Sequence, residues 1–91
     1  MTEIITQEIK FKKASIDSEF DFKLKHARKF INKGYRVQIS LLYEGKIIIN
    51  KNEGSDKLLE LANQLIDIAE IHQEPTLNKR LMIMILKPKN I

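Results

Sequence analysis

The sequence has no cysteine and no tryptophan, and it contains only three glycines and two prolines among its 91 residues. Without cysteine the chain can form neither a disulfide nor a thiolate metal site. The glycines stand apart from one another, which leaves no glycine-rich loop for a phosphate. The longest apolar run, Leu81 to Leu86, is much shorter than the roughly 20 residues of a membrane-spanning helix. Residues 1–7 carry no basic segment of the kind that opens a secretory signal.

These absences predict a cytoplasmic monomer that needs no cofactor, no metal, no membrane and no small-molecule substrate. At this length a second independent core is not expected, so residues 1–91 are predicted to form a single domain. The apolar fraction of 43% is sufficient for a packed core and too high for a disordered chain.

The sequence offers little for catalysis. Its two histidines, His26 and His72, fall on different predicted elements, and no pair of carboxylates has the spacing of metal ligands. Three acids, Asp17, Glu19 and Asp21, lie near the start of a predicted helix and suit the positive end of its dipole. A small basic enzyme of the acylphosphatase type would carry a glycine-rich anion loop followed by an arginine, and that motif is absent. We therefore predict that the chain is not an enzyme.

Positive charge is unevenly distributed along the chain. Sixteen lysines and arginines face twelve acids, which gives a net charge of +4. The whole excess lies in residues 1–46, while residues 47–91 are neutral overall and residues 56–73 carry four acids and one lysine. This segregation predicts one basic surface and one acidic helix, and the basic surface indicates an anionic partner.

Hydrophobic periodicity predicts four strands and two helices. The predicted strands are 6–13, 36–43, 71–76 and 80–86. The predicted helices are 18–33 and 55–71. The order β-α-β-α-β-β predicts an α/β fold of the two-layer α+β type, a mixed four-stranded sheet with two helices on one face. Pro75 favours an edge position for the third strand, and the fourth strand, apolar on both faces, is predicted to be central.

Residues that favour helix ends set the predicted boundaries. Ser18 is predicted to cap the first helix, and Gly34 to end it in the left-handed conformation. Ser55 is predicted to cap the second helix after a polar loop over residues 52–54. Two further segments are predicted to be a short apolar extension and a turn, namely 46–50 and 77–79.

The first helix carries the clearest candidate binding surface. Lys25, Lys29 and Lys33 follow one another at four-residue spacing, which places them on a cationic ridge opposite the apolar stripe. Phe22 projects on the same side and is predicted either to stack on a base or to pack under a neighbouring loop. Lysine outnumbers arginine, which favours phosphate contacts over base reading. The predicted RNA-binding residues are Lys10, Lys12, Lys23, Lys25, Arg28, Lys29, Lys33, Lys46, Lys79, Arg80, Lys87 and Lys89.

A series of short motifs runs through nearly the whole chain. The motifs are Glu8 to Lys12, Phe20 to Gly34, Val37 to Gly45, Ile68 to Glu70, Glu74-Pro75, Arg80-x-Met82 and Leu86 to Lys89. In this order and spacing they resemble the C-terminal domain of bacterial translation initiation factor three. The resemblance implies a two-layer α/β domain that binds the small ribosomal subunit through its ribosomal RNA. It also implies that the bound domain hinders premature joining of the large subunit and supports selection of the start codon and initiator tRNA.

The resemblance also implies where RNA is contacted. In that family the contacts come from the first helix, the loop after the second strand and the turn before the last strand. The matching positions here are Lys23, Lys25, Arg28, Lys29, Lys46 and Arg80, with Lys87 and Lys89 nearby. Two positions depart from the family pattern, since Glu44 stands where a cation is usual and Lys79 where a glycine is usual. The family's N-terminal domain and linker have no counterpart in the sequence, as in an excised domain or a short relative.

An alternative of a different class is a protein-interaction module. It would use either the acidic second helix or an exposed face of the sheet. The acids of that helix are Asp56, Glu60, Asp67 and Glu70, and the apolar face is predicted to carry Met82 and Met84.

Overall fold

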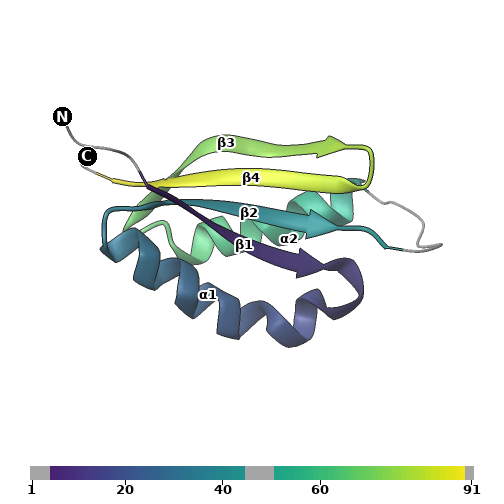
Figure 1. Cartoon of the computed structure of the whole chain (residues 1–91), viewed down its shortest axis with the longest axis horizontal. Coiled ribbons are helices and arrows are strands. Elements are labelled where there is room, and N and C mark those ends of the chain that lie inside the picture. Colours follow the sequence, from purple (N-terminus) through teal and green to yellow (C-terminus); the bar gives the residue numbers. More distant parts are fainter. Residues whose placement is uncertain (1–4, 45–50, 90–91) are drawn as a thin grey trace.

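The computed structural model describes residues 5–44 and 51–89. Its strands are β1 (Thr6–Lys12), β2 (Arg36–Leu42), β3 (Ala69–Asn78) and β4 (Leu81–Pro88). They form one sheet in the order β1-β2-β4-β3. The helices are α1 (Ile16–Asn32), which follows a short 3-10 turn η1 (Lys13–Ser15), and α2 (Lys51–Gln64). Both helices lie on the same face of the sheet, as Figure 1 shows, and the predicted fold class is confirmed.

The connections explain which strands run parallel. The helix α1 carries the chain back across the sheet, so β1 and β2 pair in parallel. The strands β3 and β4 pair antiparallel across a two-residue turn, and β4 also pairs antiparallel with β2. The central position predicted for the last strand and the edge position predicted from Pro75 are therefore both confirmed.

The core lies between the sheet and the two helices. Alternate residues of β1, β2 and β4 face the helices and are buried, among them Phe11 on β1, Ile39 on β2 and Met84 on β4, whereas the edge strand β3 buries only Ala69. The first helix adds Phe20, Ala27 and Ile31 to this cluster. The second helix adds Leu58 and Leu61, and Leu65 follows directly after its end.

The prediction that Met82 and Met84 form an exposed apolar face is wrong, because both side chains are fully buried under the helices. Side chains alternate between the two faces of a strand, so the other face of β4 carries Leu81, Ile83 and Ile85. These three are partly exposed on the helix-free face of the sheet.

The first helix begins two residues earlier than predicted. It starts at Ile16, and Ser18 lies inside its first turn with its Oγ donating to the carbonyl oxygen of Ser15 at 2.9 Å. Burial explains the earlier start, because Ile16 is 4% exposed and belongs to the core. The predicted end is confirmed, since Gly34 has a φ of 87° and its N–H donates to the carbonyl oxygen of Ile31 at 2.9 Å.

The second helix differs from its prediction at both ends. It begins at Lys51, so the segment 52–54 is helical, and Ser55 lies inside the helix with its Oγ donating to the Asn52 carbonyl oxygen at 3.2 Å. Gly54 faces the core, where a Cβ atom would lie 1.9 Å from the Tyr43 hydroxyl oxygen. That contact explains why a residue with poor helix propensity stands here.

The end of α2 comes seven residues before the predicted one. The helix stops at Gln64, and the N–H groups of Ile68 and Ala69 both donate to the carbonyl oxygen of Leu65 in the turn that follows. The turn brings Ala69 into the core as the first residue of β3. Apolar residues after Gln64 therefore keep helical spacing without forming a helix.

The hairpin that closes the sheet is shifted relative to its prediction. Leu77 belongs to β3, where it packs against the core, and the turn consists of Lys79 and Arg80. The predicted extension over 46–50 lies outside the described residues.

Candidate nucleic-acid interface

The outer face of α1 carries three exposed lysines. We call Lys25, Lys29 and Lys33 the α1 ridge; among residues 5–44 and 51–89 none of them lies within ion-pair distance of a carboxylate. The buried residues of the same helix, Phe20 and Ala27 among them, lie on its opposite side, as the spacing predicts. The predicted ridge is therefore present as a surface, while its contact with RNA stays a prediction.

An aromatic pair lies on the same face. Phe22 is 62% exposed, so the alternative that it packs under a neighbouring loop is wrong for the part of the chain that the structure describes. Its ring centroid lies 4.4 Å from that of His26, with an angle of 57° between the ring planes. His26 was not among the predicted site residues, although its four-residue spacing from Phe22 on a helix is the signal that pairs them.

Arg28, a predicted RNA contact, binds the end of α2. Its Nη2 donates to the carbonyl oxygen of Gln64 at 2.8 Å, and its Nη1 lies 3.0 Å from Oδ2 of Asp67. A guanidinium at this position satisfies a helix carbonyl that has no partner within the helix. The hydrogen bond from Arg28 holds the pKa of Asp67 below its usual value. Arg28 therefore fastens α1 to α2.

Lys23, another predicted contact, lies against the first strand. Its Nζ is 5.1 Å from the centroid of the Phe11 ring and 3.4 Å from Oε2 of Glu19, and it donates to the carbonyl oxygen of Lys10. The ammonium group is thus held in place by a carboxylate, a carbonyl and an aromatic face. This cation is less available to a partner than those of the α1 ridge.

Three further predicted contacts have a carboxylate beside them. Lys10 pairs with Glu8 at 3.6 Å, Lys12 with Glu44 at 3.8 Å, and Lys87 with Glu70 at 3.5 Å. All three pairs are exposed, so each stabilises the fold only weakly. The acid at position 44 thus faces a lysine of β1.

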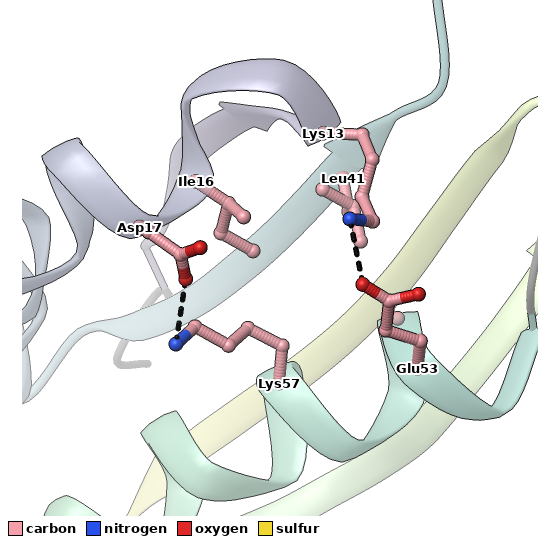
Figure 2. Close-up of a pocket in the computed structure, with 7 residues that line it drawn as sticks. Lys13, Ile16, Asp17, Leu41, Glu53 and Lys57 are labelled. Atoms are coloured by element: carbon pink, nitrogen blue, oxygen red, sulfur yellow. Dashed lines mark hydrogen bonds and ion pairs between the residues drawn. The ribbon is translucent and has the colours of Figure 1, made fainter. Parts of the chain in front are cut away.

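Two ion pairs join α1 and the turn before it to α2, and we call this line of contacts the α1–α2 seam (Figure 2). Lys13 Nζ lies 2.9 Å from Oε1 of Glu53, and Lys57 Nζ lies 2.9 Å from Oδ1 of Asp17. The hydrogen bond between Asp17 and Lys57 lowers the pKa of the carboxyl group and raises that of the ammonium group. Lys57 also lies 4.6 Å from the centroid of the Phe20 ring. These cations hold two elements together.

The β3–β4 turn places two predicted contacts at its tip. Arg80 Nε donates to the carbonyl oxygen of Tyr43 at 2.8 Å, which ties the turn to the end of β2. Lys79 has a φ of 60°, the left-handed conformation that favours glycine. This turn lies at one end of the sheet, whereas the C-terminal ends of α1 and β4 lie at the other end (Figure 1). Lys33 and Lys89 directly follow the C-terminal ends of α1 and β4, so they lie at the opposite end of the sheet from Lys79 and Arg80, and Lys46 lies outside the described residues.

Within the described part of the chain, no group of three histidines, aspartates or glutamates could hold a metal ion. His26 and His72 lie on different elements, α1 and β3. No described helix has the length and apolar character needed to cross a membrane. What the described residues do offer is a cationic and aromatic surface.

The fold and this surface define a small two-layer α/β domain with a row of exposed lysines on its first helix. The family model for the C-terminal domain of translation initiation factor IF-3 matches residues 4–89, and the chain therefore belongs to that family. The chain is 37% identical over 87 residues to translation initiation factor IF-3 of Porphyromonas gingivalis. The aligned residues cover 96% of this chain and 43% of the relative. It is 39% identical over 83 residues to the factor of Bacteroides thetaiotaomicron, covering 91% and 45%.

A third relative matches along the complete sequence. The factor of Azobacteroides pseudotrichonymphae is 34% identical over 91 residues, which cover 100% of this chain and 50% of the relative. The chain thus spans half or less of the length of these curated relatives. The resemblance stated from the motifs is confirmed.

Proposed function

We propose that the chain acts in translation initiation by binding the small ribosomal subunit through its ribosomal RNA. In this proposal the bound domain hinders premature joining of the large subunit and supports selection of the start codon and initiator tRNA. It works as a binding protein in the cytoplasm, without catalysis. Family membership supports the setting, and the unpaired α1 ridge is the single observation that carries the RNA contact.

The surroundings of each cation divide the predicted contacts into two groups. A phosphate gains most from an ammonium group that has no carboxylate beside it, because a paired one must first be separated from its partner. By this criterion the principal contacts are Lys25, Lys29, Lys33, Lys79 and Lys89, none of which has an ion pair among the described residues. The other described contacts are secondary in this proposal, and Lys46 lies outside the described residues.

The backbone at Lys79 supports a use for its charge. A non-glycine residue in the left-handed conformation costs about 1 kcal/mol or more. Lysine occupies this position at the tip of the β3–β4 turn with φ 60°, and its side chain is exposed. Lys79 is not among the described core residues, which supports a role for its charge outside the fold.

Sedimentation with purified ribosomal subunits tests the proposal. The chain is expected to sediment with small subunits, and adding it before large subunits is expected to reduce the fraction of joined ribosomes. Its apparent affinity should fall steeply with salt, by roughly 0.7 to 0.9 log units per log unit for each phosphate contact. Absence from the small-subunit fraction would overturn the proposal, and binding that ignores salt would point to a protein contact.

The protein-interaction module remains the second candidate, on the helix-free face of the sheet. Leu42 is 37% exposed there, next to Leu81 on β4, and with Glu8, Lys10 and Lys12 they line a cavity of about 240 Å³. The predicted acidic helix is a weaker candidate, because Asp67 lies in the turn after α2, Glu70 lies on β3, and Glu60 pairs with Lys57.

A lysine in place of Leu42 discriminates between the two functions. This substitution leaves the α1 ridge intact, so small-subunit binding is expected to stay unchanged. Loss of small-subunit binding in Leu42→Lys, with the fold retained by circular dichroism, would favour the sheet face instead.

A further inference from the structure

The most exposed large apolar side chain in the described part of the molecule is Phe22, at 62%. The other phenylalanines pack inward, with Phe11 and Phe20 in the core and Phe30 partly buried beside it. An exposed ring contributes little to folding, because the free energy gained from an aromatic side chain follows the area it removes from water. Stability of the fold therefore does not explain why a phenylalanine stands at position 22.

The neighbours of Phe22 indicate what it would bind. His26, one helical turn further on, packs its ring against that of Phe22 at a centroid distance of 4.4 Å. Lys25 and Lys29 lie three and seven residues beyond Phe22 and are exposed without an ion-pair partner in the described ranges. Successive lysines of the α1 ridge are about 6 Å apart along the helix axis. An aromatic face beside a row of cations is the combination that binds single-stranded nucleic acid.

Resting on the function proposed above, we propose that an unpaired nucleobase of the bound RNA stacks on the Phe22 ring. His26 supports the ring from its other side, and Lys25 and Lys29 contact the phosphates that flank the base. The base must come from a loop, bulge or strand end, since bases inside an A-form helix are not accessible for stacking. Stacking tolerates any base, so the platform selects unpaired structure over sequence.

Variants of Phe22 separate stacking from a simple apolar contact. In binding to purified small subunits, Phe22→Ala is expected to weaken affinity roughly five- to hundredfold, the effect of losing one base–aromatic stack. Phe22→Leu should lose nearly as much because it keeps an apolar side chain without an aromatic face, and Phe22→Trp should bind at least as tightly. None of the three removes a charge, so the salt dependence should keep its slope.

Ile66 provides the matched control. It is 58% exposed but lies after α2, away from the α1 ridge, so Ile66→Ala is expected to bind like the unaltered chain. If Phe22→Ala binds like the unaltered chain, no base stacks on this ring. If Phe22→Leu retains full affinity while Phe22→Ala loses it, the contact is apolar and the partner there is a protein.

A second measurement does not depend on ribosomes. Because the chain has no tryptophan, Phe22→Trp introduces a single fluorescent reporter at the platform. Titration with oligoadenylate is expected to quench this fluorescence, whereas an abasic oligonucleotide of equal length should bind the lysines without quenching. Equal responses to both strands would overturn the stacking. If the chain fails to sediment with small subunits, the proposed function falls while this titration still decides the inference.

Discussion

The lysines on the outer face of α1 and the lysines at the α1–α2 seam carry the same charge but differ in whether a carboxylate lies beside them. On the α1 ridge, Lys29 and its two neighbours have no carboxylate within ion-pair distance among the described residues. At the seam, Lys13 and Lys57 each lie 2.9 Å from a carboxylate oxygen of another element. The comparison shows that net charge alone does not locate a binding surface, because the position of the nearest acid decides which cations are available.

Two triple variants that each remove three positive charges test this comparison most directly. Replacing the unpaired lysines in Lys25→Ala/Lys29→Ala/Lys33→Ala is expected to weaken small-subunit binding about a hundredfold and to lower the salt slope by about 2 to 3. Replacing paired lysines in Lys10→Ala/Lys12→Ala/Lys87→Ala removes the same charge and is expected to cost less than about tenfold. Both are measured by sedimentation over a range of salt.

Thermal unfolding provides the control for these triple variants. All six substitutions lie on exposed or partly exposed side chains, so each triple variant should keep its free energy of unfolding within about 1 kcal/mol of the unaltered chain. Equal losses of affinity in the two triple variants would show that ion pairing does not decide which lysine binds.

A substitution at Gly54, which lines the same pocket as the seam residues, tests how tightly α2 packs against the end of β2. Gly54→Ala is expected to destabilise the fold by about 1 to 3 kcal/mol, because the new Cβ would lie 1.9 Å from the Tyr43 hydroxyl oxygen. In a Tyr43→Phe background that oxygen is absent, and the same change should cost less, because only the 3.2 Å contacts with Leu41 and the ring remain and alanine favours a helix by about 1 kcal/mol over glycine. Urea unfolding of the four chains measures the coupling. An equal cost in both backgrounds would contradict the contact.

At Lys79 the β3–β4 turn combines backbone strain with a charge that has no ion pair among the described residues, so replacing this lysine should change stability and binding in opposite directions. Lys79→Gly is expected to stabilise the fold by up to about 1 kcal/mol, since glycine adopts φ 60° without strain. The same change should weaken small-subunit binding a fewfold through loss of the charge. Lys79→Arg keeps both the charge and the strain and is the control. A loss of stability in Lys79→Gly would show that the lysine side chain contributes to the turn.

The smallest expected effect is the pH dependence of the seam pair. The pKa of Asp17 is lowered in the folded chain, so its contribution to stability is present above its ordinary value of 3.8 and lost as pH falls through the folded value. The pKa of Lys57 is raised, so its contribution is present below its ordinary value of 10.5 and lost at higher pH.

The variant Asp17→Asn removes the acid limb of this dependence and only part of the alkaline limb, because Glu60 also raises the pKa of Lys57. Between pH 5 and 9, roughly, its free energy of unfolding should differ from that of the unaltered chain by a constant amount. The difference should shrink below about pH 4, which denaturant unfolding at several pH values measures. A difference that persists unchanged in acid would show that the pair contributes nothing through its charge.

The fold could be predicted because local signals agree with one another. Alternation in β1 and helical spacing in α1 reflect the faces that each element buries, and Gly34 marks the end of α1 by a conformation that other residues avoid. The boundaries of α2 could not be predicted, because they depend on tertiary contacts. A glycine stands inside α2 at position 54 because Tyr43 occupies the space where a side chain would lie.

The candidate site divides in the same way. The positions of Lys25, Lys29 and Lys33 follow from helical periodicity alone, so the ridge could be predicted. The partner of Arg28 could not, because Asp67 lies 39 residues away in the sequence. Ion pairs between elements distant in sequence have no local pattern, so the sequence does not distinguish a cation such as Arg28, which joins two elements, from the exposed lysines of the α1 ridge.

The strand order has a consequence for assembly of the domain itself. Residues that form β1, α1 and β2 make one half of the sheet, and those that form α2, β3 and β4 make the other, with a single antiparallel ladder from Val37–Leu86 to Leu42–Leu81 between them. The seam pairs and the bond from Arg28 to Gln64 all cross the same boundary. Each half is contiguous in the chain, so assembly of the domain joins two chain segments through one ladder, a shared core and charged side-chain contacts that also include Arg80 with the Tyr43 carbonyl.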